Sequence, residues 1–163
     1  MYAVSYTHLD VYKRQDQPVT VFPMKAFPVI KDLVTDVSWN YKVNKKIPPF
    51  QPRPGVEWKM YQPDVDRVQE FRKCIECFLC QDVCHIIRSH DLSERFYGPR
   101  FFVRVASLEM HPKDVLDRRE QTREQGGLGY CNITKCCTCL LYTSRQFPRE
   151  APCECDALLP DLS

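Results

Sequence analysis

The chain has 163 residues, a formal net charge of +2 and ten cysteines. Its length allows one domain, or one domain and part of a second. The nearly balanced charge gives no case for nucleic acid as a main partner, and no apolar run reaches the roughly 18 residues needed to cross a bilayer. Because no secretory leader pattern is found, we expect reduced thiols that bind metal rather than a disulfide framework.

Both ends of the chain differ in character from the rest. Ser5–Gln15 resembles a translated sequencing adaptor, and so does the stretch that starts at Cys139. We therefore expect residues 1–15 to be a non-native leader and residues 139–163 to be a non-native tail whose cysteines have no role.

Residues 16–60 combine strand-forming residues with prolines. Val19–Phe22 carries β-branched and aromatic residues and is predicted to be a strand. Val29–Val34 is short and apolar, and its periodicity fits a turn of helix as well as a strand. Prolines cluster ahead of Pro63 and predict an extended linker.

A helix is predicted to begin at Pro63, because proline suits the first turn of a helix and acidic residues follow it. One apolar stripe of this helix is expected to face inward, and the helix leads directly to Cys74. The stripe consists of Val65 and Val68 with Phe71 or Arg72.

Two further helices are predicted between the cysteine groups. Arg100–Met110 places apolar residues at helical spacing, with its charged residues outside. The inward set is Phe101, Phe102, Val105 and Leu108, and the outward pair is Arg104 and Glu109. Pro112 is expected to end this helix and to start the next, which ends at Gly126–Gly127. In that helix Val115 and Leu116 would point inward, and Asp114 would pair with Arg118 one turn later.

The cysteines in the middle of the chain fall into two groups. The first group reads C-x2-C-x2-C-x3-C and consists of Cys74, Cys77, Cys80 and Cys84, and the second consists of Cys131, Cys136 and Cys137. Three thiolates separated by two-residue gaps can surround one inorganic cluster, and the fourth cysteine typically binds a second cluster. The second group would complete both sites. We therefore predict a mainly α fold, with a two-cluster domain over residues 61–138 whose folding is coupled to metal binding.

A structural zinc site is the alternative from a different class. Zinc usually takes two C-x2-C pairs and stops at four ligands, whereas this chain offers more cysteines than one zinc ion uses. The surplus favours clusters.

Residues beside the cysteines allow more than one role in this interpretation. The apolar residues between the ligands are expected to pack around the cluster and exclude water. They are Ile75, Phe78, Leu79 and Val83. His85 fits a hydrogen bond to a quinone or to a cluster sulfur, and it fits a surface or capping role equally well. No nucleophile–base pair, paired carboxylates or phosphate-binding glycine loop is found, so the chain is not expected to transform a substrate by itself.

Two stretches, Glu70–Cys84 and Gly129–Thr138, are similar to the iron–sulfur subunit of succinate dehydrogenase and fumarate reductase. Phe27–Val34 and Gly98–Pro112 also look like that family, and the resemblance covers Asp16–Thr138. Two cysteine motifs in register make this a specific match. The resemblance implies the helical ferredoxin part of that subunit, preceded by an extended Pro-rich linker.

The resemblance also implies the ligands and the partners. Cys74, Cys77 and Cys80 would hold a [4Fe–4S] cluster, and Cys84, Cys131 and Cys137 would hold a [3Fe–4S] cluster. Cys136 would be a buried non-ligand. Electrons would pass from an FAD-containing flavoprotein subunit through the clusters to quinone beside the membrane anchor subunits. The chain would then be peripheral, at the cytoplasmic face of the cell membrane.

Three features depart from the family pattern. We expect the amino-terminal [2Fe–2S] domain of the family to be missing from this sequence, so residues 16–60 would hold only its end and the linker. The fourth ligand of the [4Fe–4S] cluster would fall at Leu141, with Cys139 two residues early. His85 and Asn132 stand where ubiquinone-linked members have other residues, which favours menaquinone. The two-cluster domain of another flavoenzyme complex and an inert partial reading frame remain open alternatives.

Overall fold

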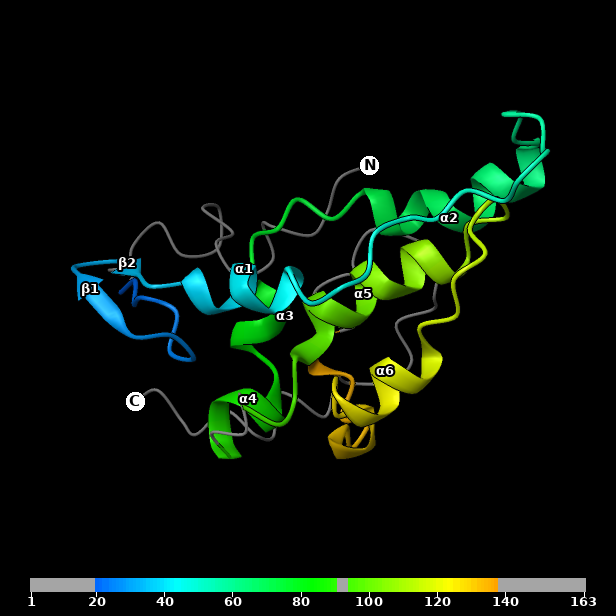
Figure 1. Ribbon diagram of the computed structural model, residues 1–163. Coiled ribbons are helices and arrows are strands. Elements are labelled where there is room, and N and C mark those ends of the chain that lie inside the picture. Colours follow the sequence, from blue (N-terminus) through cyan, green and yellow to red (C-terminus); the bar gives the residue numbers. More distant parts are fainter. Residues whose placement is uncertain (1–19, 91–93, 138–163) are drawn as a thin grey trace.

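The computed structural model describes residues 20–90 and 94–137, and these form a mainly helical body with one small hairpin (Figure 1). In chain order the elements are β1 (Val29–Lys31), β2 (Val34–Thr35), α1 (Ser38–Asn44), α2 (Gln62–Arg72), α3 (Leu79–Asp82), α4 (His85–His90), α5 (Gly98–Glu109), α6 (Arg119–Glu124) and the 3-10 helix η1 (Leu128–Tyr130). The mainly helical content agrees with the predicted fold class.

Helix α5 lies at the centre of the body, and α1, α2 and α3 pack against it (Figure 1). Its inward residues Phe101 and Val105 are buried, and Phe102 is half-buried. Phe101 and Val105 form one core cluster with Val43 of α1, and Phe102 packs both against this cluster and against a second one around Phe96. The predicted apolar face of this helix is therefore confirmed.

Helix α2 begins one residue before Pro63, close to the predicted start. Val68 is buried, and Val65 and Phe71 are half-buried, so the predicted stripe does face inward. The last helical residue is Arg72, which leaves Cys74 just beyond the helix end. Because α2 packs on α5, the start of the first cysteine group is tied to the core.

The segment that the sequence left undecided is an antiparallel hairpin. Strand β1 pairs with β2, and the turn between them carries Asp32 in the left-handed region at φ 51°. The apolar residues of the hairpin are all exposed, and it projects from one end of the body (Figure 1). Thr20–Phe22, in contrast, is irregular, so the strand predicted there is wrong; Val19 lies outside the described residues. A strand needs a neighbour to satisfy its backbone, and the described residues pair none with this segment.

The Pro-rich stretch is hydrogen-bonded to the helical body. Pro52 forms an isolated antiparallel bridge with Asp114, and the Val115 N–H donates to the Gln51 carbonyl at 3.1 Å. The Arg118 side chain is fully buried and donates to the carbonyls of Pro48 at 3.0 Å and Pro49 at 2.8 Å.

This attachment explains why the helix predicted from Pro112 is wrong. The segment from Pro112 to Arg118 is engaged with the Pro-rich stretch, and α6 begins only at Arg119. Val115 is consequently 49% exposed rather than inward. The predicted pair between Asp114 and Arg118 exists at 2.9 Å, but both side chains are buried and neither belongs to a helix.

Two smaller expectations can also be compared with the structure. Glu109 was placed outside, but its side chain is only 22% exposed, and it accepts the Arg118 backbone N–H at 2.7 Å. The predicted glycine end of the last helix is confirmed: α6 ends at Glu124, and the Gly126 N–H donates back to the Gln121 carbonyl at 3.0 Å.

Candidate metal centre

The first cysteine loop is shaped by two left-handed residues. Glu76 has φ 58° and Phe78 has φ 60°, and each lies next to Cys77. Phe78 is buried, with its ring edge-on to Tyr41 at a centroid distance of 5.5 Å. Cys80 then lies within α3, and Cys84 lies between α3 and α4. The turns at Glu76 and Phe78 therefore bend the chain between successive cysteines.

The apolar residues of this loop do not all pack inward as predicted. Phe78 is buried and Val83 is half-buried, but Ile75 is 84% exposed and Leu79 is 47% exposed. For Ile75 and Leu79 the prediction is wrong, because the left-handed turns direct only part of the loop toward α5. His85 opens α4 and is half-buried.

The second cysteine loop follows the glycine pair. Gly127 has φ 68°, and a Cβ there would lie 1.8 Å from the Arg95 carbonyl oxygen, so only glycine fits. Helix η1 then leads to Cys131, and Ile133 and Lys135 again have left-handed backbones, at φ 58° and 61°. Cys136 is buried, as predicted, and Cys137 is half-buried.

Both cysteine loops contain non-glycine residues in the left-handed backbone region. Among the described residues, the non-glycine positions with positive φ are Asp32, Glu76, Phe78, Ile133 and Lys135. All except the hairpin residue Asp32 lie between cysteines. Left-handed residues alternating with right-handed ones turn backbone N–H groups into an anion-binding concavity, which is common at iron–sulfur sites. Strain of this kind also concentrates at functional sites.

The thiols of the two loops influence one another's ionisation. The pKa of Cys80 is raised to about 12, chiefly by burial and also by the neighbouring charges of Cys74, Cys77 and Cys137, against a backbone hydrogen bond at Gln81 that lowers it. Burial likewise raises the pKa of Cys84, and Cys137 and Cys131 add to the increase. Backbone hydrogen bonds at Ile87 and Ile86 partly oppose it.

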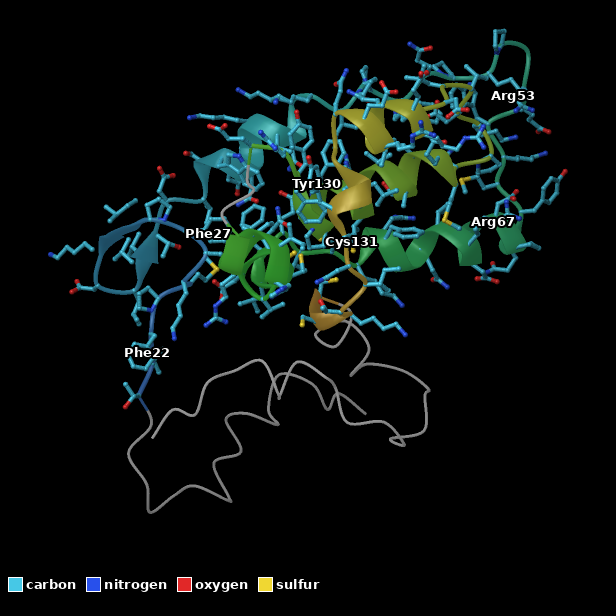
Figure 2. All side chains as sticks on the ribbon, turned by 90° about the horizontal axis from the view of Figure 1, so that it is seen from below. Phe22, Phe27, Arg53, Arg67, Tyr130 and Cys131 are labelled. Atoms are coloured by element: carbon cyan, nitrogen blue, oxygen red, sulfur yellow. The ribbon has the colours of Figure 1, made fainter. Side chains whose placement is uncertain are left out.

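The structure thus brings the two groups together. Cys137 acts on both Cys80 and Cys84, although more than 50 residues separate it from them in the sequence. Figure 2 shows Cys131 and Tyr130 over the middle of one face of the body. No disulfide joins the seven cysteines of the described ranges. Their proximity without covalent pairing is what a shared cofactor site requires.

The donor set fits a cationic group that several thiolates share. Half-buried thiols that raise one another's pKa cannot all ionise unless positive charge is supplied between them. Within the part of the chain that the structure describes, no three His, Cys, Asp or Glu side chains converge closely enough to hold one metal ion. The thiols are therefore grouped without meeting at a single point.

A buried amide network holds α3, and the sequence analysis missed it. The Gln81 side chain is 1% exposed; its Nε2 donates to Asn40 Oδ1 at 3.0 Å and to the Tyr97 carbonyl at 3.1 Å. Gly98 leaves room for it, since a Cβ there would lie 2.0 Å from Gln81 Oε1. Only the position of Gln81 between Cys80 and Cys84 could have pointed to such a role.

Some predicted features cannot be compared with the structure. The assignment of Leu141 as a substitute for a fourth ligand, and the cysteines from Cys139 onward, lie outside the described residues, as does the predicted leader over residues 1–15. In the described ranges, no helix has both the length and the apolar character that a bilayer-spanning helix needs.

A mainly helical body that brings two cysteine loops together is consistent with a helical ferredoxin-like domain. The chain is, more specifically, related in sequence and fold to the iron–sulfur subunits of succinate dehydrogenase and fumarate reductase. Those relatives are subunits of oxidoreductase complexes.

Three comparisons establish this relationship. The chain is 28% identical over 130 residues to the succinate dehydrogenase iron–sulfur subunit of Bacillus subtilis, covering 75% of this chain and 50% of that protein. It is 30% identical over 132 residues to the fumarate reductase iron–sulfur subunit of Mycobacterium tuberculosis, covering 74% and 51%. A chain of the Mycobacterium smegmatis Sdh1 complex in the apo form matches with a TM-score of 0.71 and 55% identity, covering 77% of this chain and 54% of that one.

The chain therefore spans about half the length of the curated relatives it matches. No family model matches the sequence.

Proposed function

We propose that this chain is the two-cluster, electron-transfer part of the iron–sulfur subunit of a succinate:quinone oxidoreductase or fumarate reductase. The observation that supports this most directly is the grouping of Cys84 with Cys131 and Cys137 across the two loops. Cys131 and Cys137 lie near enough to Cys84 to influence its ionisation across the two loops, and the relatives of the chain are named iron–sulfur subunits.

Two sets of cysteines share the ligand roles in this proposal. Cys74, Cys77 and Cys80 hold a [4Fe–4S] cluster, and Cys84, Cys131 and Cys137 hold a [3Fe–4S] cluster. When bound, such clusters accept and release single electrons. The chain itself supplies the thiolates, the backbone N–H groups of the left-handed turns, and a helical body that fixes the spacing between the two sites. A cluster between these loops also supplies the positive charge that lets the thiols ionise together.

The partners follow from the same proposal. An FAD-containing flavoprotein subunit exchanges electrons with the clusters at one end of the relay. Membrane anchor subunits and a quinone lie at the other end. The sequence pattern at His85 and Asn132 favours menaquinone as that quinone. The chain is then a peripheral part of a complex at the cytoplasmic face of the cell membrane. In this proposal the domain over residues 61–138 carries the relay, and residues 16–60 are the end of a [2Fe–2S] domain and the linker that follows it.

Anaerobic reconstitution of the full chain with iron and sulfide tests the proposal. We expect visible absorption from sulfide-bridged iron, and an electron paramagnetic resonance signal of a three-iron cluster in the oxidised sample. Cys131→Ser and Cys137→Ser should each abolish that signal, because each removes a ligand. Cys136→Ser is the matched control, since Cys136 is adjacent and buried but is not assigned as a ligand.

Three outcomes contradict the proposal. One is a colourless chain that binds only zinc, which would favour the structural zinc module. Another is a chain that takes up no metal, as expected of an inert partial reading frame. The third is equal loss of signal in the Cys136→Ser control. A separate variant, Leu141→Cys with family-like sequence beyond it, should increase iron content, because it supplies the fourth [4Fe–4S] ligand.

A further inference from the structure

A buried guanidinium lies beside the first cysteine loop. Arg100 is in the first turn of α5, and its side chain is 4% exposed. Its Nη2 donates to Glu76 Oε1, forming an ion pair between α5 and the loop. Among the described residues this is the acidic partner of the guanidinium, whose Nε is buried without a hydrogen-bond acceptor. A buried cation needs such a partner, because removing it from water is costly.

The partner of Arg100 occupies a critical place in the loop. Glu76 lies between Cys74 and Cys77 and has a left-handed backbone at φ 58°. A non-glycine residue keeps this conformation only when its surroundings hold it there. The ion pair connects the Glu76 side chain to the central helix, so it restrains the turn that separates the first two cysteines.

The same end of α5 also restrains the far side of the loop. The Arg100 backbone N–H donates to Gln81 Oε1 at 3.5 Å, and Gln81 Nε2 donates to the Tyr97 carbonyl at 3.1 Å. Gln81 directly follows Cys80. The start of α5 therefore contacts the loop on both sides of Cys77 and Cys80, through Glu76 on one side and Gln81 on the other.

We propose that Arg100 is a positioning residue, which acts through Glu76 to hold the first cysteine loop in the shape that receives its cluster. This inference rests on the proposed function for the identity of the cluster, while the restraint itself belongs to the chain. The Arg100 Nε offers a hydrogen bond for which the described residues provide no acceptor, and a thiolate or sulfide of a bound cluster is such an acceptor.

The test uses the full chain and two readouts. The first readout needs no iron: the reduced, iron-free chain is alkylated under native conditions, and the labelling of half-buried Cys80 is measured relative to exposed Cys77. Glu76→Gln and Arg100→Met should raise this ratio severalfold, because the loop loses its restraint. Arg100→Lys should give an intermediate ratio, since it keeps the charge without the planar fork. Arg104→Met is the matched control on an exposed position of the same helix.

The second readout is cluster retention. In the reconstituted chain, Glu76→Gln should speed loss of iron to a chelator by about 10-fold, the usual scale for groups that support metal ligands. Its urea midpoint without iron should also fall, because the substitution leaves the buried Arg100 guanidinium with a neutral amide in place of its carboxylate partner, so iron loss is measured well below that midpoint. A double substitution, Glu76→Gln with Arg100→Met, should be no worse than Arg100→Met alone, since both act through one pair.

The outcomes separate the two proposals. If the unmodified chain binds no iron, the proposed function fails, and the alkylation ratio still tests the restraint. If the chain binds iron but Glu76→Gln changes neither the ratio nor the chelation rate, the positioning role is overturned. The same conclusion follows if Arg104→Met has effects as large as those of Arg100→Met.

Discussion

Replacing Gln81 by leucine would test whether the buried amide network holds the cysteine-bearing helix α3. Leucine has a similar size but cannot donate to Asn40 Oδ1 or to the Tyr97 carbonyl, which now accept at 3.0 Å and 3.1 Å. Each buried acceptor left without a donor costs about 1–3 kcal/mol. The extra apolar burial of leucine offsets roughly 1 kcal/mol or more. We therefore expect a net loss of about 2 kcal/mol in the free energy of unfolding.

Urea unfolding of the reduced, iron-free chain, followed by circular dichroism, measures this loss. The control is Gln69→Leu, because the hydrogen bond of the Gln69 side chain to Asp66, at 3.4 Å, is exposed, and the change should alter stability by less than about 0.5 kcal/mol. Asn40→Leu combined with Gln81→Leu should cost less than the sum of the two single changes. A loss below about 0.5 kcal/mol for Gln81→Leu, or strict additivity, would refute the reasoning.

Three further predictions concern other parts of the body. Because burial raises the pKa of Cys80 to about 12 from a usual value near 9, the folded iron-free chain keeps this thiol protonated where the unfolded chain ionises it. The contribution of the protonated Cys80 thiol to the free energy of unfolding is thus fully present below pH 9 and is lost toward pH 12, by about 1.4 kcal/mol per pH unit. Urea midpoints measured across this range should therefore fall as the pH rises, and Cys80→Ser should reduce that fall. Gly98→Ala should lower the melting temperature, since φ is +81° and the new Cβ would lie 2.0 Å from Gln81 Oε1; an unchanged melting temperature would show that the loop adapts freely. Arg118→Met should cost about 3–5 kcal/mol in urea unfolding, because it leaves the buried Asp114 carboxylate without its cation, and a cost below about 1 kcal/mol would contradict that.

The long helices could be predicted from the sequence because their own residues decide them. In α5, Phe101 and Val105 repeat at helical spacing, and both are buried. The stripe of α2 follows the same rule. The cysteine spacing likewise indicated two groups of metal-binding thiols, and Cys137 of the second group does influence Cys80 and Cys84 of the first.

The failures lie where distant parts of the chain decide the local structure. Pro112 resembles a helix start, but the residues that follow it form hydrogen bonds with Gln51–Arg53 and use Arg118 to bind proline carbonyls. Sequence periodicity contains no information about such partners. The exposure of Ile75 and the burial of Gln81 were missed for a related reason: both depend on left-handed turns at non-glycine residues, which residue type does not reveal.

Those turns have a consequence for how the protein matures. A β-branched residue such as Ile133 at φ 58° raises the free energy of the folded chain by about 1 kcal/mol or more, and Glu76, Phe78 and Lys135 add similar amounts. The Glu76–Arg100 ion pair and the packing of Phe78 against Tyr41 offset part of this cost in the first loop, and a bound cofactor would offset more, so we expect the loops to be the first regions to rearrange before it is inserted. The helical body can then persist as a platform on which the loops close once iron and sulfide arrive.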